Sequence, residues 1–254
     1  MGVLIRDISG NDNHTEWPST LAVPPANPPA PGVGRSARSF NSFLTDAEEW
    51  FDGSVVVPTL AAASGCTIAA WCRPGSSACA GGGKVPFAFN SAAQLGVDRN
   101  RAMVRYDTCD FPDKYAIIDS EDPISAGGVA DPTEYPVLTY QFVAMTITAT
   151  ELRLVVNGSE TASKATTVAY PAASDSLTIG AELDLPADPS DFWEGRLDEI
   201  LTFDRVVPDL DLAELTAIGL DAIDGDWRQT ALDLAPVSYW PLDAQGWIVG
   251  GAAL

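Results

Sequence analysis

An oxygen-rich turn lies near the start of the chain, in the segment RDISGNDNH (6–14). Asp7, Asn11 and Asn13 bring carboxylate and amide oxygens together there, and calcium takes such oxygens as ligands. The alternative is that Asp7 caps its own turn by accepting hydrogen bonds from backbone N–H groups. The turn itself leaves both interpretations open.

Glycoside hydrolysis would need two carboxyl groups flanking one bond, about 5–5.5 Å apart in a retaining enzyme. Glu182 and Asp184 share one face of a strand, but a Leu-Pro pair follows and ends that strand at once. Asp198 and Asp204 also share a face, yet they stand too far apart along the strand to act as a pair. We therefore predict that the chain is not an enzyme and has no catalytic residues.

Nucleophilic and phosphate-binding chemistry are not supported either. His14 is the one histidine, and no G-x-S-x-G segment exists for it to activate. The segment AGGGK (80–84) lacks the first glycine and the Ser/Thr of a phosphate-binding loop, so it predicts a flexible connection.

Aromatic side chains are the other source of binding chemistry, because exposed rings stack on sugars whereas most rings pack inside. Trp71 and Trp240 lie within strand-like segments and are expected in the core. The less constrained tryptophans are candidates for glycan stacking, namely Trp17, Trp50, Trp227 and Trp247.

The four cysteines, Cys66, Cys72, Cys79 and Cys109, contain no C-x-x-C pair, so a zinc site is disfavoured. Buried free thiols are the expectation. The alternative, a disulfide such as Cys79–Cys109, would need an oxidising compartment.

Composition excludes several classes of partner. The chain has 254 residues, 46% of them hydrophobic, and a formal net charge of −21. Such an acidic surface repels nucleic acids and anionic membranes, and it suits multivalent cations. No run approaches the roughly 18 apolar residues of a membrane span, and the first residues do not resemble a signal peptide. We expect a soluble protein with no nucleic-acid partner and no membrane insertion.

The pattern of elements predicts an all-β fold of two antiparallel sheets in one domain, residues 1–254. Short alternating segments recur, Asn157-Gly158 is a strong hairpin signal, and only Asp209–Leu220 has helical spacing. The Pro-rich segment 18–34 is expected to be an extended surface connection. The predicted core includes Ile68, Trp71, Val143, Leu152, Leu154, Ile179, Leu197 and Ile200.

Several of these segments, taken in order, resemble a known family. They are RDISGNDNH, FDGSVVVP, CTIAAWCRP, FVAMTITATELRLVVNG, LTIGAELD, FWEGRLDEILTFDRVV and LAEL. The chain resembles the laminin-G-like, concanavalin A-like lectin and glucanase superfamily, in particular its LamG-like jelly-roll type. The resemblance implies a jelly-roll sandwich with one short late helix. Gln141, where the family often has Trp, and the long loop 91–135 depart from the pattern.

The resemblance also implies a structural calcium ion at Asp7 and Asp198, with Asp243 as a third ligand. Family members usually begin with a strand that precedes the D-x-S-G-N turn. Here a similar segment, APVSYWPLDA, stands at the far end, so strand 235–243 is expected beside VLIRDISG (3–10). It would pair there as a circular permutation or be exchanged with another subunit.

Together these features favour a non-enzymatic structural or binding module. The first hypothesis is a virion protein of a tailed bacteriophage, as a capsid decoration, spike or fibre component that is assembled in the host cytoplasm. Its partners would be copies of itself or other virion proteins, and cell-surface glycans. The alternative is an extracellular carbohydrate-binding or glycosidase-associated module of a secreted bacterial protein.

Overall fold

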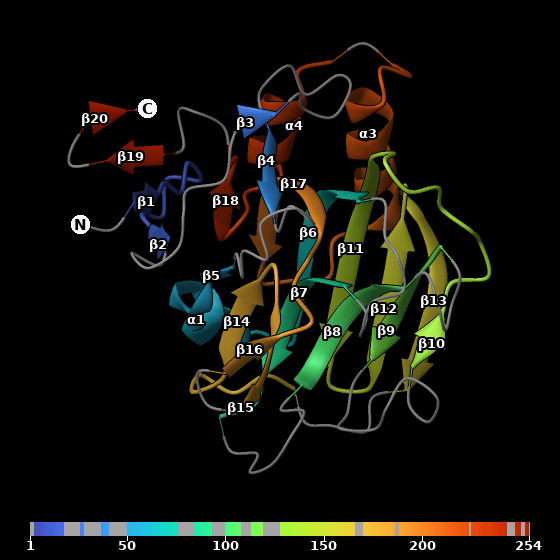
Figure 1. The fold of residues 1–254 in the computed structure, drawn as a ribbon, viewed down its shortest axis with the longest axis horizontal. Coiled ribbons are helices and arrows are strands. Elements are labelled where there is room, and N and C mark those ends of the chain that lie inside the picture. The colour runs from blue at the N-terminus through green and yellow to red at the C-terminus, as the bar shows by residue number, and fades with distance from the viewer. Residues whose placement is uncertain are drawn as a thin grey trace.

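Two antiparallel sheets packed face to face make up the body of the protein (Figure 1). This confirms the predicted two-sheet sandwich. The computed structural model of the 254-residue chain describes residues 3–17, 26–27, 37–40, 50–75, 84–92, 100–107, 113–118, 128–165, 170–185, 188–223, 225–242, 247–249 and 252–253.

The larger sheet has eight strands, and β6 and β11 lie at its centre. Its order is β13-β12-β11-β6-β17-β4-β3, and β18 also pairs with β17. The strands are β3 (Ala26–Asn27), β4 (Ala37–Phe40), β6 (Gly65–Pro74), β11 (Gln141–Thr148), β12 (Glu151–Val156), β13 (Ser159–Ala165), β17 (Gly195–Phe203) and β18 (Ser238–Trp240).

The facing sheet has six strands in the order β10-β9-β8-β7-β14-β5. They are β5 (Phe51–Asp52), β7 (Lys84–Asn90), β8 (Asn100–Asp107), β9 (Lys114–Ile118), β10 (Val129–Ala130) and β14 (Ser176–Ile179). Two further strands, β15 (Glu182–Leu185) and β16 (Asp188–Ser190), form a separate hairpin.

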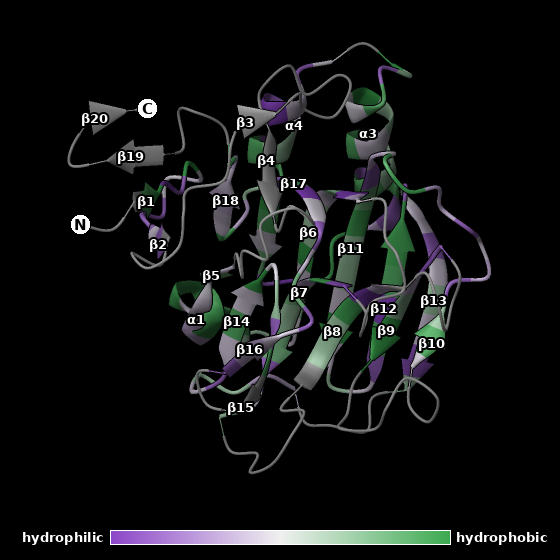
Figure 2. Cartoon of the chain, in the orientation of Figure 1, coloured by the Kyte–Doolittle hydropathy of each residue, from purple (hydrophilic) through white to green (hydrophobic). Residues whose placement is uncertain are grey.

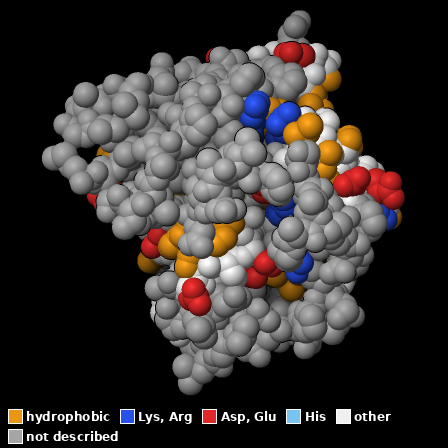
Figure 3. Space-filling model, in the orientation of Figure 1, with side chains coloured by type: hydrophobic (Ala, Val, Ile, Leu, Met, Phe, Trp, Pro, Cys, Tyr) orange, Lys and Arg blue, Asp and Glu red, His pale blue; other side chains and the backbone are white. Residues whose placement is uncertain are grey.

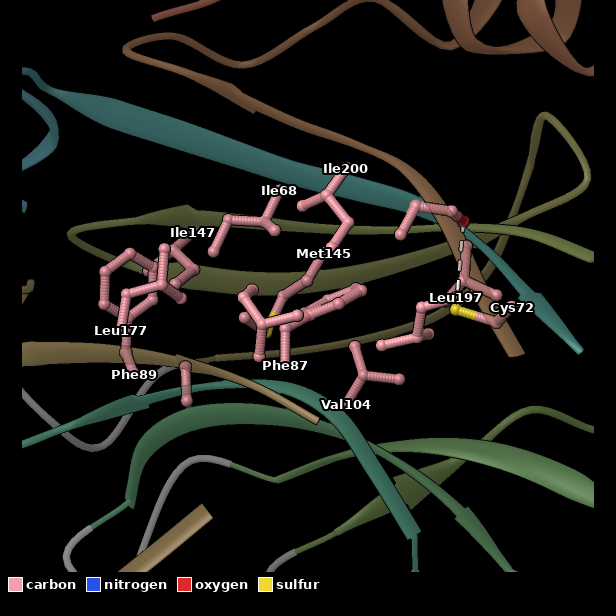
Figure 4. Packing of buried hydrophobic residues seen from close by; sticks show 14 of the residues in the cluster. Ile68, Cys72, Phe87, Phe89, Val104, Met145, Ile147, Leu177, Leu197 and Ile200 are labelled. Atoms are coloured by element: carbon pink, nitrogen blue, oxygen red, sulfur yellow. Dashed lines mark hydrogen bonds between the residues drawn. The ribbon is translucent and has the colours of Figure 1, made fainter. Parts of the chain in front are cut away.

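The main core fills the space between the two sheets. Figure 4 shows side chains of the larger sheet, such as Ile68, Met145 and Ile200, pointing toward Phe87 and Val104 of the smaller one. Every residue predicted for the core is fully buried: Ile68, Trp71, Val143, Leu152, Leu154, Ile179, Leu197 and Ile200.

A second core covers the outer face of the larger sheet. Trp71, Phe142 and Leu201 point to this face and pack against helices α3 (Asp209–Gly219) and α4 (Trp227–Asp233). The central strands are therefore apolar on both faces, as a strand between two packed layers must be. Figure 2 shows the resulting hydrophobic residues along β11 and β12.

The predicted hairpin turn is present. Asn157 and Gly158 have φ angles of 52° and 77° and join β12 to β13. These left-handed conformations suit a two-residue turn, and Asn and Gly adopt them at low cost. Gly158 also lies against Ala213 of α3, so the turn contacts the helix layer.

The segment after FDG is helical. Residues Ser54–Val56 form a 3-10 helix that continues into α1 (Val57–Ala61). Proline at the first turn of a helix loses no hydrogen bond and has a suitable φ, and Pro58 stands there. Helix α4 was not predicted. Its N-cap, Asp226, accepts a hydrogen bond from the backbone N–H of Gln229 at 3.1 Å.

The two chain ends meet in a small sheet of order β2-β1-β19-β20 (Figure 1). Its strands are β1 (Val3–Ile5), β2 (Thr15–Trp17), β19 (Trp247–Val249) and β20 (Ala252–Ala253). Before this sheet, the chain places β18 against β17, where Ile200 is opposite Trp240. The Pro-rich segment 18–34 lies mostly outside the described residues.

Two cysteines can be assigned. Cys66 and Cys72 are buried free thiols, and burial raises the pKa of both. Cys79 and Cys109 lie outside the described residues. None of the described helices combines the length and hydrophobicity needed to cross a membrane.

Candidate functional site

The Asp7 carboxylate is the centre of the N-terminal turn. It is 3% exposed and accepts four hydrogen bonds. Oδ1 accepts from the backbone N–H of Ser9 at 2.9 Å and of Tyr239 at 2.8 Å. Oδ2 accepts from the Ser9 hydroxyl at 2.8 Å and the Asn13 backbone N–H at 2.9 Å. Asp7 therefore caps its own turn, as the second interpretation predicted. It also accepts a hydrogen bond from β18, more than two hundred residues later in the chain.

The same turn holds strand β18 in place. The backbone N–H of Ile8 donates to the Tyr239 carbonyl at 3.0 Å, and Asn13 Nδ2 donates to the Val237 carbonyl at 2.7 Å. In return, Trp240 Nε1 donates to the Asn13 carbonyl at 2.9 Å. Strand β18 therefore lies between β17 and the N-terminal turn, within one chain. Strand β1 itself pairs with β2 and β19.

The predicted calcium ligands do not fit a cation here. Two backbone N–H groups of the turn and one of β18 point at Asp7, and such donors repel a positive ion while they satisfy the carboxylate. Strand β18 separates this turn from Asp198 on β17, and Asp243 lies outside the described residues. Within the described part of the chain, no three His, Cys, Asp or Glu side chains are grouped to hold a metal. We therefore do not expect calcium at Asp7, and calcium at Asp198 and Asp243 stays a prediction.

Asp198 belongs instead to a buried acidic cluster. β17 has a bulge after Asp198, where Glu199 has a φ of 50°, and both side chains are fully buried. Arg228 of α4 lies 3.6 Å from Glu199 Oε1, and its guanidinium lies over the Tyr239 ring at 5.6 Å. Burial, with the Glu199 carboxylate beside it, raises the pKa of Tyr239 well above its usual range. The cluster joins β17, β18 and α4.

The tryptophan candidates have separate outcomes. Trp227 is 2% exposed, and its Nε1 donates to the Leu215 carbonyl at 2.9 Å, so its proposed role in glycan stacking is wrong. It is buried because α4 packs on the outer face of the larger sheet. Trp50 is half-buried before β5. Trp17 is opposite Val3 and Trp247 opposite Ile5 in the small sheet; their side chains lie outside the described residues.

The structure reveals a polar row that we did not predict, on the outer face of the larger sheet. Arg73 of β6 is directly opposite Arg196 of β17. Both alternate with core residues, since Cys72 and Leu197 point inward. Tyr140 precedes β11 next to Arg73 and packs at the edge of the second core. We name Tyr140, Arg73 and Arg196 the arginine row; all three are half-buried.

Each member of the arginine row is held in place. Arg73 Nε donates to the Leu138 carbonyl at 2.8 Å, and the Arg196 guanidinium is hydrogen-bonded to Tyr140. Burial, and next the Arg196 charge, lower the pKa of Arg73. Burial, and next the Asp198 charge, raise the pKa of Tyr140. The row therefore places two guanidinium groups side by side at the end of the helix-covered face.

Sequence reasoning missed this row for a definite reason. Alternation places Arg73 and Arg196 on an outer face, but nothing in the chain shows that β6 and β17 are neighbours in this register. Basic residues are also few, 14 Lys and Arg against 35 Asp and Glu. On the face shown in Figure 3, blue side chains form only small groups.

Comparison with known proteins shows the same architecture elsewhere. A family model described as the concanavalin A-like lectin/glucanases superfamily matches residues 51–213. No curated protein sequence matches the chain. Among solved structures, tailspike protein 2 from Escherichia coli O157:H7 bacteriophage CAB120 is similar over 91% of this chain and 30% of its own, with 13% identity and a TM-score of 0.58.

Two sialidase structures are also similar. The CBM40 of the Ruminococcus gnavus IT-sialidase, solved bound to α2,3-sialyllactose, has 13% identity and a TM-score of 0.51, over 66% of this chain and 92% of its own. A Trypanosoma rangeli sialidase has 8% identity and a TM-score of 0.53, over 83% of this chain and 30% of its own. The chain spans about a third of the tailspike and of this sialidase. At these identities the likeness shows the fold alone.

Proposed function

Because the chain belongs to the concanavalin A-like lectin/glucanases superfamily, we propose that it is a non-catalytic module that binds glycans, and that it works in the virion of a tailed bacteriophage. The observation that carries the glycan-binding part is the arginine row. It combines an aromatic ring and two fixed donor groups, all half-buried, on the outer face of a lectin-type sandwich. Binding sites for small ligands commonly place a few polar groups beside an apolar surface in this way.

The positions of the carboxylates support a role without catalysis. Asp198 is fully buried and Glu182 is 4% exposed, so neither is placed to flank a sugar bond in solvent. Asp204 is exposed in the turn after β17, away from Asp198. The side chain of Asp184 lies outside the described residues.

The acidic surface and the tailspike-like fold support the virion part of the proposal. A net charge of −21 keeps a protein soluble at high local concentration. The partners would be other copies of the chain or other virion proteins, and the phage would meet cell-surface glycans through this module.

A secreted carbohydrate-binding module is the second candidate. The observation that favours it is the size match to the sialidase CBM40, of which 92% is covered. Such a module would be extracellular and part of a larger protein. It would use the same arginine row, so the two candidates differ in location and partners rather than in chemistry.

Two measurements test these proposals. A glycan panel probed with the full chain should give binding without release of sugar over the same incubation. Mass spectrometry of phage particles purified from a lysate of the source organism should find this chain in stoichiometric amount. Sugar release would contradict the non-catalytic role. Absence from particles, together with recovery from the culture medium, would favour the secreted module.

A further inference from the structure

We infer that the arginine row binds the carboxylate of an acidic glycan. The inference rests on the proposed glycan-binding function and names the class of ligand for that site. It depends on three features of the row: two like charges placed side by side, no carboxylate oxygen within 4.0 Å of them among the described residues, and an apolar surface beside them.

The first feature is the register of β6 and β17. Residues directly opposite each other in an antiparallel pair have their Cβ atoms about 4.5–5.5 Å apart, and like charges at such positions destabilise the sheet. The strands are held together at this point. The Gly75 backbone N–H donates to the Glu194 carbonyl at 2.8 Å, and a side chain at Gly195 would clash with the Arg73 carbonyl. The backbone therefore keeps Arg73 and Arg196 adjacent in spite of their repulsion.

The second feature is that, among the described residues, neither arginine has a carboxylate in direct contact. Other arginines have carboxylate partners. Arg153 Nε lies 2.7 Å from Glu160 Oε2 and its Nη2 lies 2.8 Å from Asp209 Oδ1. Arg105 Nη1 lies 3.9 Å from Asp191 Oδ2. Across the described residues, neither Arg73 nor Arg196 has a carboxylate oxygen within 4.0 Å. Among the described residues this pair of arginines therefore has no carboxylate in direct contact, and the nearest acidic influence on the row is the Asp198 charge that acts on Tyr140.

The third feature is the shape of the groups around the two charges. A guanidinium presents a planar fork of donors that matches the two oxygens of a carboxylate. The Arg73 fork is oriented by Leu138, whose own side chain is 49% exposed, and Arg196 is oriented by Tyr140. An aromatic ring and an exposed leucine beside the donors suit the apolar face of a sugar ring.

The charge of the whole protein narrows the ligand further. A polyanion such as a nucleic acid would be repelled by the field of a chain with a net charge of −21, against which the two arginines of the row supply little attraction. A glycan with a single carboxylate carries one negative charge, so the net charge of the protein repels it less than it repels a polyanion. The two guanidinium groups can then bind that carboxylate directly. An anion between the two arginines would also offset the repulsion by Arg196 that contributes to the lowered pKa of Arg73 after burial.

The test compares glycans that differ only in charge. Calorimetric titration of the full chain uses trigalacturonic acid against its methyl ester, and α2,3-sialyllactose against lactose. Inorganic phosphate serves as a plain anion. The same titrations use Arg196→Gln, with Arg153→Gln as the control, because that substitution removes the same charge from an arginine that has carboxylate partners.

Melting temperatures of the three proteins separate binding from structure. We expect at least one acidic glycan to bind the wild type and its neutral counterpart to bind far more weakly. The Arg196→Gln variant should bind the acidic glycan about 10- to 100-fold more weakly, as expected for charged hydrogen bonds. Its melting temperature should stay equal or rise, because a repulsion is removed. Arg153→Gln should bind like the wild type and melt lower.

Four results would overturn the inference. Equal binding of acidic and neutral glycans, unchanged in Arg196→Gln, would leave the glycan-binding function standing and remove only this site. A lower melting temperature for Arg196→Gln would make the pair structural. Phosphate bound as tightly as the acidic glycan would refute a site for carboxylates. Failure of every glycan to bind would refute the proposed function as well.

Discussion

Replacing Asp7 with asparagine should destabilise the protein strongly although the side chain keeps its shape. The amide oxygen can still accept from the backbone N–H groups of Ser9 and Tyr239. The amide NH2 replaces Oδ2 and then faces the backbone N–H of Asn13, so one accepted bond becomes a contact between two donors. The Ser9 hydroxyl can turn and accept instead of donating.

The size of the effect follows from these contacts. A hydrogen bond to a charged group contributes about 1.5–3 kcal/mol, and a neutral bond about 0.5–1.5 kcal/mol. Two bonds therefore weaken by about 1 kcal/mol each and one is lost, for a total of about 3–5 kcal/mol. Water can reach part of the turn, so we expect a decrease in the free energy of unfolding of about 2–4 kcal/mol. For a chain of this size that corresponds to a melting temperature lower by roughly 5–15 °C.

Asp12→Asn is the matched control, because it makes the same chemical change in the same turn. The Asp12 side chain is 93% exposed and its φ is 56°, a conformation that asparagine accepts readily. Its free energy of unfolding should stay within about 0.5 kcal/mol of the wild type.

Thermal and urea denaturation, followed by circular dichroism, measure both variants with and without a chelator. A ligand that binds only the native state would raise stability when added. With Asp7 saturated by protein donors, we expect the chelator to leave the wild-type curve unchanged. An Asp7→Asn variant as stable as Asp12→Asn would refute the role of the four hydrogen bonds. A chelator-dependent loss of stability that Asp7→Asn abolishes would restore the calcium site.

Three further changes test other parts of the fold. Gly219→Ala should lower the free energy of unfolding by about 1–3 kcal/mol in urea denaturation, because its methyl group would overlap the buried Trp71 ring; unchanged stability would mean that α3 can shift. Burial raises the pKa of the Cys66 thiol to about 12 from 9.0, so the unfolded thiol ionises first. Stability should fall between pH 9 and 12, by about 1.4 kcal/mol per pH unit for this group, and a Cys66→Ala slope as steep as the wild type would contradict this. Deleting 235–254 removes β18 and should give aggregated protein in size-exclusion chromatography; a soluble, equally stable monomer would show that the β17 edge needs no partner.

Local patterns were enough to predict most of the sandwich. Alternation in CTIAAWCRP and ELRLVV placed Ile68, Leu152 and Leu154 in the core, because side chains alternate across a strand whatever its neighbours are. Asn157-Gly158 predicted its turn, since few residue pairs accept two positive φ angles. Helix Asp209–Gly219 was predicted within one residue of its end.

Only the tertiary structure decided what those elements do together. Which strands are neighbours, and in which register, depends on contacts between distant segments; that choice placed Arg73 opposite Arg196 and Asp7 against Tyr239. The bulge at Glu199 and the burial of Trp227 under α4 have the same origin, since they exist only once the outer layer has packed on the sheet. The sequence by itself determines which side chains alternate along each strand. A site built from residues of two paired strands is decided only when the fold brings those strands together.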